Sequence, residues 1–424
     1  MRLPAADWLN RADLAVLVKA LGAGNARYVG GAVRDTLLRL AVKDVDIATP
    51  LDPHEVMRRL KAHAIQVVPT GIEHGTVTAI LKGGPVEITT LRHDVSTDGR
   101  RATVAFASEW QDDAARRDFT INALYADPVT LEVFDWFGGW DDLQARCLRF
   151  IGDAHERIRE DHLRILRYFR FQARFGSQPA DPAAESACSE LAATLKGLSR
   201  ERVGMEMMTL LGLPDPAPTV ARMADLGVLQ MVLPEADIAA LAALVTEEAR
   251  QGVEADALRR LAALIPADVP MAEQVASRFR LSGAQKKRLA LAAGRTQKPS
   301  PLQVRGLGEG DSASNRASKT VGLPLSPALS PEGEREHTAR TLAYRLRYPA
   351  ALDRLLLTGA SVAPLEGWDI PVFPLKGGDL VASGITVGPE VSRLLQAIEA
   401  RWIAAGFDDA AIPALLDAEL ANRA

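Results

Sequence analysis

Two aspartates separated by a single residue, Asp44 and Asp46, follow a glycine pair at Gly30 and Gly31. Side chains two residues apart on a β-strand point to the same face, so a strand here would present both carboxylates together. Two such carboxylates can bind Mg²⁺ beside a phosphate, and the backbone N–H groups of a glycine turn can approach that phosphate. The pattern therefore predicts both halves of a site for nucleotidyl transfer. The alternative interpretation of the two aspartates alone is a solvated pair after a glycine turn.

Two further charged residues extend this prediction. Arg34 lies one helical turn after the glycine pair, where a guanidinium can bind two phosphate oxygens at once. The alternative role for Arg34 is a partner for Asp35 or another carboxylate of its helix. Glu87 lies among β-branched residues on a predicted strand, where an acidic side chain is costly unless it is paired or binds a metal. It is the candidate for a third catalytic carboxylate, and an outward-facing glutamate is the alternative.

A second motif combines cations with an acceptor in the run Arg116-Arg117-Asp118-Phe119-Thr120-Ile121-Asn122. Arg117 can bind a triphosphate, and Asp118 can accept a hydrogen bond from a ribose 2′-hydroxyl. Asn122 belongs to the same run and is predicted with them to bind nucleotide. Taken alone, two arginines followed by an aspartate are also typical of a solvated surface.

A third motif has charges at every third position, at Asp161, Arg164, Arg167 and Arg170. This spacing places all four on one face of a predicted helix. An aspartate can accept from the exocyclic amine that cytosine and adenine share, while an arginine donates to a ring nitrogen or carbonyl oxygen. The motif therefore predicts a face that selects nucleobases, and a solvated ladder of salt bridges is the alternative.

The elements that must position these motifs change character near residue 140. Before that point, strands are predicted at residues 26–29, 45–48, 65–68, 76–81, 86–91 and 131–136. Helices are predicted between them at residues 12–21, 32–40 and 52–63, the last with an Asp52-Pro53 start. Residues 93–112 are polar and lack a regular pattern, which predicts a mobile loop.

Beyond residue 140 the pattern is almost entirely helical. Helices are predicted at residues 153–175, 200–211, 220–226, 238–251, 256–265, 271–281 and 389–400. Residues 374–380 are predicted as a loop. Residues 296–337 are rich in glycine, proline and serine, and we predict a disordered insertion between helices there.

The composition excludes several classes of protein. The 424 residues carry a net charge of −4, which argues against a wholly basic nucleic-acid coat protein but not against a local basic groove. Two isolated cysteines are too few for a disulfide framework or a zinc site. No apolar run reaches the length of a membrane span or signal segment, so a cytoplasmic protein without membrane contact is predicted.

Together, the motifs resemble those of the class II tRNA nucleotidyltransferases, the family of CCA-adding enzymes and the related bacterial poly(A) polymerases. The resemblance covers about residues 26–213 and, more weakly, residues 375–395. It implies an α+β protein with a polymerase-β-like head and then a helical neck, body and tail. The head would comprise residues 1–140, and the neck residues 141–213, which contain the nucleobase-selecting helix. The body and tail, residues 214–424, would bind RNA.

The resemblance also implies roles for individual residues. Gly31 and Arg34, with Gly30 beside them, would hold the triphosphate, and Asp44 and Asp46 would hold two metal ions. Arg117 and Asp118 would contact phosphate and ribose. Asp161 and Arg164 would contact the bases of CTP and ATP, with support from Arg167 and Arg170. The segment 198–202 resembles the motif that buttresses the templating helix.

The predicted reaction is addition of CMP and AMP from CTP and ATP to the 3′-hydroxyl of tRNA, with Mg²⁺ as cofactor and no protein partner inferred. Two Mg²⁺ ions would activate the hydroxyl and stabilise the leaving pyrophosphate during in-line attack. The alternatives are a poly(A) polymerase and an enzyme that adds only CC or only A. Transfer to a small molecule or a protein, and a non-catalytic RNA-binding relative, are more distant alternatives.

Overall fold

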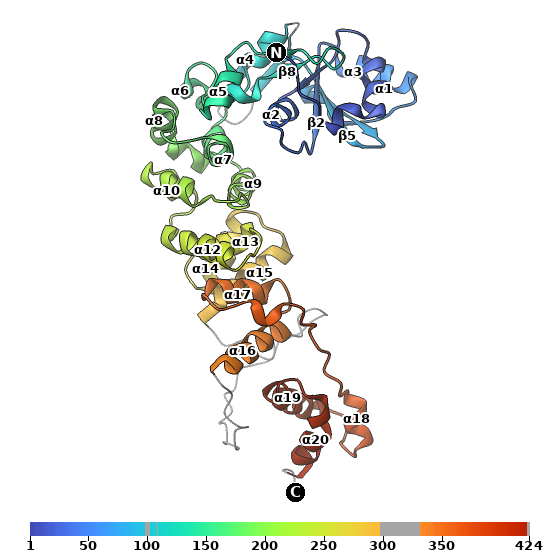
Figure 1. Cartoon of the computed structure of the whole chain (residues 1–424), viewed down its shortest axis with the longest axis vertical. Coiled ribbons are helices and arrows are strands. Elements are labelled where there is room, and N and C mark those ends of the chain that lie inside the picture. The colour runs from blue at the N-terminus through green and yellow to red at the C-terminus, as the bar shows by residue number, and fades with distance from the viewer. Residues whose placement is uncertain (98–101, 108, 297–330, 422–424) are drawn as a thin grey trace. The chain divides into compact units, whose positions relative to one another are not determined.

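The structure is a computed structural model that describes residues 1–97, 102–107, 109–296 and 331–421. It divides into two compact units, Met1–Ala236 and Asp237–Ala424 (Figure 1). The first unit contains the sheet and the second is helical, which confirms the predicted α+β class. The boundary between the units follows residue 236, whereas the three-region division at residues 140 and 213 stays a prediction.

The first unit is built on a mixed sheet, which has seven strands in the described part of the chain. The strand order is β3-β4-β5-β2-β1-β8-β9, with β2 and β5 parallel and all other neighbours antiparallel. The strands are β1 (Arg27–Val29), β2 (Val45–Thr49), β3 (Gln66–Gly71), β4 (Thr76–Leu81), β5 (Gly84–Thr90), β8 (Tyr125–Ala126) and β9 (Val133–Phe134). The motif strands β1, β2 and β5 therefore lie at the centre of the sheet.

Helices of the first unit cover this sheet and continue beyond it. Helix α2 contacts β1 and β2, and α3 contacts α1, β3 and β4. Asp52 caps α3 as predicted, because its carboxylate accepts hydrogen bonds from the backbone N–H groups of His54 and Glu55. The helices are α1 (Ala12–Leu21), α2 (Gly31–Leu37), α3 (Pro53–Ala62), α4 (Trp110–Ala115), α5 (Gly139–Ala145), α6 (Ala154–Glu160), α7 (Arg164–Phe175), α8 (Pro182–Glu190), α9 (Arg200–Leu211), α10 (Ala217–Asp225) and α11 (Leu229–Val232).

The predicted loop at residues 93–112 is wrong for residues 93–97, 102–106 and 110–112, which lie in strands or a helix. Strands β6 (Arg92–Thr97) and β7 (Ala102–Phe106) pair as an antiparallel hairpin, and α4 begins at Trp110. Residues 98–101 and 108 of that prediction lie outside the described residues. The β-branched residues Val95, Thr97 and Thr103 favour strands, but neither the polar run of β6 nor the apolar run of β7 shows the alternation that identifies a half-buried strand.

The single helix predicted at residues 153–175 is also wrong, because α6 and α7 are separate helices. Asp161 has an extended backbone, with φ of −148°, and its carboxylate accepts a hydrogen bond from the Leu163 N–H group. Asp161 therefore does not share a helical face with Arg164, Arg167 and Arg170. Aspartate favours such a position because its side chain can satisfy backbone donors at the start of a helix.

An aromatic cluster fixes α7 against the second motif. The Phe119 ring lies 4.9 Å from that of Phe150 and 5.4 Å from that of Phe171. Tyr168 stacks on Phe150 with its ring centroid 5.8 Å away, and all four rings are buried. Burial of these large side chains stabilises the unit and places the arginines of α7 beside Asp118.

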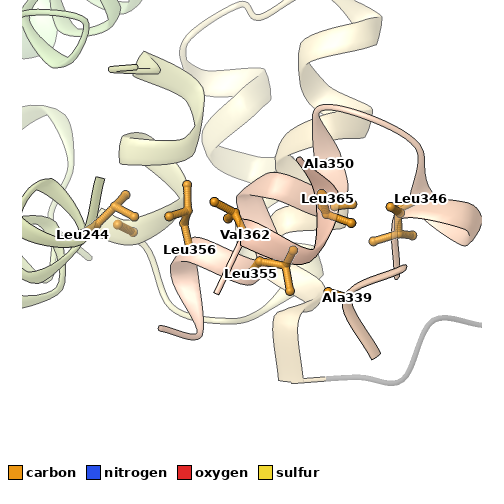
Figure 2. Packing of buried hydrophobic residues seen from close by; sticks show 11 residues of the cluster. Leu244, Ala339, Leu346, Ala350, Leu355, Leu356, Val362 and Leu365 are labelled. Carbon is orange, nitrogen blue, oxygen red and sulfur yellow. The ribbon is translucent and has the colours of Figure 1, made fainter. Parts of the chain in front are cut away.

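The second unit has two apolar clusters in its described residues. One cluster joins α12 and α13 to α16 and α17 through Leu244, Ala263, Ala343 and Leu355 (Figure 2). The other surrounds Trp402. The helices are α12 (Ile238–Arg250), α13 (Ala257–Leu264), α14 (Val269–Arg278), α15 (Gly283–Ala293), α16 (Pro331–Leu346), α17 (Ala350–Leu357), α18 (Gly377–Ala382), α19 (Pro389–Ala404) and α20 (Ile412–Ala421).

Two predictions about this unit need correction. The predicted insertion at 296–337 overlaps α16, so it is wrong for residues 331–337, where Pro331 occupies the favourable first position of a helix. Residues 297–330 lie outside the described residues. The loop predicted at 374–380 contains the start of α18. Among the described helices, none is both long and apolar enough to cross a membrane.

Candidate active site

A polar cavity of about 340 Å³ in the first unit brings the sequence motifs together. Its described lining contains six arginines and four carboxylates. The lining residues are Val29, Asp46, Ile47, Glu87, Thr89, Arg92, Arg116, Arg117, Asp118, Asp161, Leu163, Arg164, Arg167 and Arg202. An excess of arginines inside a concave site favours an anionic ligand.

Two carboxylates lie on adjacent strands at one side of this cavity. Asp46 of β2 and Glu87 of β5 are register partners in the parallel pair. Burial and the neighbouring charge of Glu87 raise the pKa of Asp46 to about 6, although Arg117 acts in the opposite direction. Asp44 immediately precedes β2, is exposed, and adds to the rise in the pKa of Asp46. The predicted acidic group is therefore centred on Asp46 and Glu87, with Asp44 at its edge.

The donors of this acidic group fit a hard divalent cation. Carboxylate oxygens are the ligands that Mg²⁺ prefers, and a cation would relieve the repulsion that raises the pKa of Asp46. Among the described residues, no three histidine, cysteine or acidic side chains are grouped closely enough to hold an ion by themselves. Magnesium sites in nucleotide enzymes commonly combine one or two carboxylates with phosphate oxygens of the substrate, so this acid pair suits such a site.

The glycine turn lies against the second motif. Gly30 has a φ of +65°, in the left-handed region that favours glycine. A Cβ atom on Gly30 would lie 3.5 Å from Nη1 of Arg117. Gly31 begins α2, and neither glycine is among the residues that line the cavity. The turn therefore borders the arginine side of the site.

Arg34 lies outside the cavity lining and has protein partners. Its side chain is buried, with Nε 2.7 Å from Asp35 and Nη1 2.5 Å from Asn122. Its guanidinium also lies over the Phe175 ring, 4.2 Å from the centroid. This geometry agrees with the alternative interpretation, a partner for Asp35, and the predicted phosphate contact of Arg34 stays a prediction.

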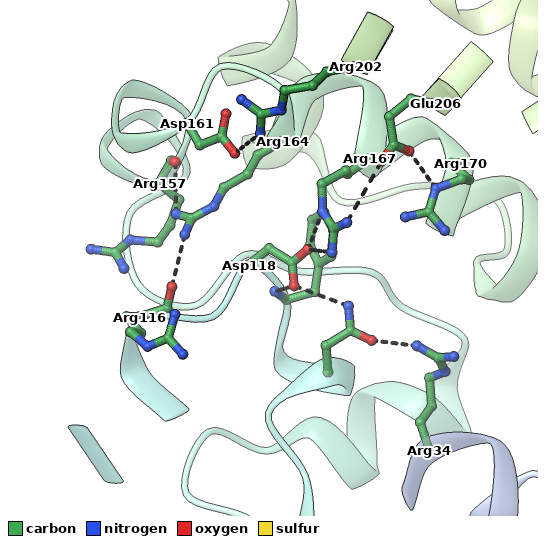
Figure 3. A network of polar contacts seen from close by, with 12 residues as sticks. Arg34, Arg116, Asp118, Arg157, Asp161, Arg164, Arg167, Arg170, Arg202 and Glu206 are labelled. Atoms are coloured by element: carbon green, nitrogen blue, oxygen red, sulfur yellow. Dashed lines mark hydrogen bonds and ion pairs between the residues drawn. The ribbon is translucent and has the colours of Figure 1, made fainter. Parts of the chain in front are cut away.

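Asp118 joins the second motif to α7 (Figure 3). Its Oδ1 accepts a hydrogen bond from Asn122 at 3.1 Å, and its Oδ2 accepts two from Arg167 at 2.8 and 2.5 Å. Burial opposes ionisation of Asp118, but the charge of Arg167 and these hydrogen bonds outweigh it and lower the pKa to about 2. Asp118 is therefore an anion at neutral pH, and it holds Arg167 at the cavity.

Helix α9 supports the arginines of α7 from the other side (Figure 3). Glu206 accepts a hydrogen bond from Arg170 at 2.5 Å and lies 3.8 Å from Arg167. Arg170 is outside the cavity lining, whereas Arg167 is part of it. Arg167 is thus fixed between two carboxylates, and Arg170 anchors one of them.

The two residues predicted to select the base both line the cavity and have separate supports. Asp161 accepts a hydrogen bond from Arg202 at 2.6 Å. Arg164 donates to the backbone carbonyls of Arg157 and Arg116, each at 2.9 Å, and to Glu160. The contact expected of the buttressing segment 198–202 is therefore present through Arg202.

Sequence reasoning missed several residues of the site. Arg92 was hidden beside the predicted loop, and Arg116 belonged to a predicted motif without a role of its own. Asp113 lies three and four residues before Arg116 and Arg117, a helical spacing that could have identified it as their partner. The partner of Arg202 could not be assigned from sequence, because the two segments are far apart along the chain.

The chain is similar to known proteins along most of its length. Residues 26–149 match the family described as the poly A polymerase head domain, and residues 180–239 match a probable RNA and SrmB-binding site of polymerase A. Human CCA tRNA nucleotidyltransferase 1, mitochondrial, is 33% identical over 391 residues, covering 90% of this chain and 83% of that protein. The chain belongs to the CCA tRNA nucleotidyltransferase family.

Solved structures of this family share the fold. The CCA-adding enzyme of Bacillus stearothermophilus in complex with CTP is 24% identical, with 97% of this chain and 98% of that chain covered and a TM-score of 0.66. The CCA-adding enzyme of Thermotoga maritima, complexed with tRNA, is 20% identical over 100% of both chains, with the same TM-score of 0.66. The resemblance inferred from the sequence motifs is therefore confirmed, and a nucleotidyltransferase family implies dependence on a divalent metal.

Proposed function

We propose that this protein is a CCA-adding tRNA nucleotidyltransferase, which transfers CMP and AMP from CTP and ATP to the 3′-hydroxyl of tRNA and releases pyrophosphate. Membership in the family supports this function, and one observation in the structure carries it. A single cavity contains an acid pair, a group of arginines and the Asp161–Arg164 segment. These are the parts needed to align a hydroxyl, bind a triphosphate and select a base.

The arginine side of the cavity would bind the triphosphate. Arg116 and Arg117 present guanidinium groups, which match phosphate oxygens in geometry and charge. The Gly30–Gly31 turn lies beside Nη1 of Arg117, so the backbone N–H groups of the turn would contribute to the same phosphate site. Fixing the α-phosphate here for in-line attack supplies positioning and charge neutralisation, which dominate catalysis of phosphoryl transfer.

The acid pair would act on the reacting oxygens through the metal. Asp46 and Glu87, with Asp44 at their edge, would hold the divalent cation together with phosphate oxygens of the substrate, and we propose Mg²⁺ as that cation. When bound, that ion supplies Lewis acidity and lowers the pKa of an attacking hydroxyl. The carboxylates themselves orient the site, and their position on neighbouring central strands keeps their spacing fixed.

The opposite wall would read the base. Asp161 offers an acceptor to the amine that cytosine and adenine share, and Arg164 offers donors to the neighbouring ring position. Arg202 and the carbonyls of Arg116 and Arg157 hold these two side chains. Asp118, already ionised, would accept from the ribose hydroxyl while it positions Arg167.

Removal of the Asp161 carboxylate should blur nucleotide choice. We expect Asp161→Ala to reduce discrimination of CTP and ATP against UTP and GTP by about tenfold to a hundredfold, because a hydrogen bond to a charged group is lost. The affinity for pyrophosphate should change little. Single-nucleotide extension of a truncated tRNA with each of the four nucleotides measures the discrimination.

The control for this experiment is Glu156→Ala on α6, since Glu156 is exposed and lies outside the cavity lining. We expect wild-type discrimination in the control. An unchanged preference for CTP and ATP in a folded Asp161→Ala protein would contradict the templating role.

The proposed function is tested by the product of the reaction with tRNA that lacks its 3′-terminal CCA. We expect addition of two cytidines with CTP alone, no extension with ATP alone, and three nucleotides but no more with both. Long adenosine tails without cytidine would instead identify a poly(A) polymerase, the alternative suggested by the matching head-domain family. Products of CC or A alone would identify a partial enzyme.

The cellular compartment is a separate proposal. We propose a cytoplasmic location, because two isolated cysteines fit a reducing compartment. The human relative is named mitochondrial, so fractionation of cells that express the full chain is the measurement that decides between the two compartments.

A further inference from the structure

A buried carboxylate lies behind the arginine side of the cavity. Asp113 of α4 is 1% exposed and has no direct place in the cavity lining. It accepts hydrogen bonds from three lining residues: the backbone N–H of Arg92 at 3.2 Å, the side chain of Arg116 at 2.8 Å, and that of Arg117 at 3.2 Å. One anion therefore contacts residues from two separate elements that meet at the site.

A tyrosine completes this arrangement. The Tyr125 hydroxyl of β8 donates to Oδ2 of Asp113 at 2.5 Å and accepts from Nε of Arg117 at 2.8 Å. The ring is held edge-on by Trp110 and Trp136, with centroid distances of 6.2 and 5.5 Å. Arg117 is thus fixed through both Nε and Nη2 by groups that cannot move easily.

The electrostatics favour this geometry at neutral pH. Burial opposes ionisation of Asp113, but the charges of Arg117 and Arg116 and the Tyr125 hydroxyl outweigh it and lower the pKa to about 2. Guanidinium groups gathered at one wall repel each other when no phosphate is bound. An anion placed behind them offsets this repulsion without occupying the space that a ligand needs.

These hydrogen bonds do not use every nitrogen of the Arg116 and Arg117 guanidinium groups. Arg116 uses Nε and Nη2 toward Asp113, and Arg117 uses Nη2 toward Asp113 and Nε toward Tyr125, so Nη1 takes no part in these bonds in either residue. Nη1 of Arg117 lies beside the Gly30 turn. An ordinary exposed helix salt bridge would neither be buried nor serve two arginines and a backbone amide at once.

We propose that Asp113, together with Tyr125, is a positioning residue that orients Arg116 and Arg117 toward the phosphates of the incoming nucleotide. This inference rests on the proposed function, in which the ligand is a nucleoside triphosphate. CTP and ATP share the triphosphate and differ in the base. Asp113 and Tyr125 therefore set the affinity for phosphate and do not affect the choice of base.

The test compares Asp113→Asn, Tyr125→Phe and the control Asp112→Asn in the full chain. Asp112 is the neighbouring residue of α4 and is exposed. For each protein, pyrophosphate binding is measured by calorimetry, and KM and kcat are measured for CTP and for ATP. Pyrophosphate serves as a probe of the phosphate subsite that requires no turnover.

We expect Asp113→Asn to weaken pyrophosphate binding at least about tenfold and to raise KM for CTP and ATP by the same factor. The ratio of kcat/KM for the two nucleotides should stay within about twofold of the wild type. Tyr125→Phe should shift the same quantities in the same direction by about threefold. The control should match the wild type.

The proposal is overturned if folded Asp113→Asn binds pyrophosphate as the wild type does, or if kcat falls while KM is unchanged. A change in the ratio of kcat/KM for CTP to that for ATP, accompanied by a change in KM, would also overturn the proposal. If Asp113→Asn does not fold, wild-type pyrophosphate affinity in Tyr125→Phe overturns the proposal. A wild-type protein that binds pyrophosphate but adds no nucleotide to tRNA would contradict the proposed function and leave the positioning role intact.

Discussion

Replacement of Asp46 by alanine should lower nucleotide incorporation by about a thousandfold or more and leave tRNA affinity within about threefold. The expected loss corresponds to about 4 kcal/mol of transition-state stabilisation, which is within the several kcal/mol that a metal ion supplies. Asp46 is the half-buried member of the acid pair, whereas its register partner Glu87 on the adjacent strand is exposed. RNA is held mainly through its phosphates and shape, so a change at this pair should not release it.

The measurement is extension of a truncated tRNA under single-turnover conditions, with tRNA binding followed separately by filter retention. The matched control is Asp141→Ala, an exposed aspartate of α5 in the same unit. Turnover within tenfold of the wild type in folded Asp46→Ala would contradict the metal assignment. Loss of tRNA binding together with turnover would show that the acid pair shapes the RNA site as well.

The acid pair illustrates what the sequence could predict. Asp46 and Glu87 are about forty residues apart, yet both could be assigned to strands from local β-rich patterns. The two residues lie side by side because β2 and β5 pair in parallel, and no local sequence pattern specifies that pairing. The chemistry was therefore predictable from residue types, and the resemblance to a family supplied the arrangement in space.

Arg34 and Asp161 show what residue spacing alone leaves unspecified. The helical spacing after the glycine pair predicts a phosphate contact for Arg34, which stays a prediction, but it does not specify the contacts with Phe175 and Asn122 that the structure shows. Asp161 was assigned to a continuous helix because charges recur every three residues. The structure ends that helix at Glu160, since Asp161 satisfies the backbone of the next one. The contacts of Arg34 depend on partners far away in sequence, whereas the helix end at Asp161 has a local cause.

The hairpin β6–β7 shows a different limit. Strand β6 is mostly polar and β7 is a short, mostly apolar run, so neither sequence shows the alternation by which half-buried strands are recognised. The prediction of a loop was a direct consequence. Arg92, the first residue of β6, lies between the predicted strand 86–91 and the predicted loop, and it was missed as a cavity residue.

A buried group of charges in the second unit leads to the largest expected effect on stability. Glu248 of α12 accepts hydrogen bonds from Arg259 and Arg260 of α13 at 2.7 and 2.8 Å, and all three residues are 2% exposed. Asp353 of α17, which is fully buried, lies 3.7 Å from Arg259 and 2.7 Å from Arg288 of α15. The group links four helices, and the burial of Glu248, Arg259, Arg260 and Asp353 keeps water from screening their charges.

Replacement of Glu248 by glutamine should destabilise the second unit by about 3 kcal/mol. Glutamine keeps the shape of the side chain but removes the charge that compensates two buried guanidinium groups, and breaking a buried ion pair from one side costs about 3–5 kcal/mol. Hydrogen exchange in peptides from α12 and α13 reports this unit separately from the first one. The neighbouring Glu247→Gln is the matched control, because Glu247 pairs with the exposed Arg250 and such surface pairs contribute at most about 1 kcal/mol. If both substitutions change the stability of the second unit equally and little, Asp353 alone compensates the arginines. A large loss of stability confined to Glu248→Gln would identify Glu248 as the anion on which the packing of α12 against α13 depends.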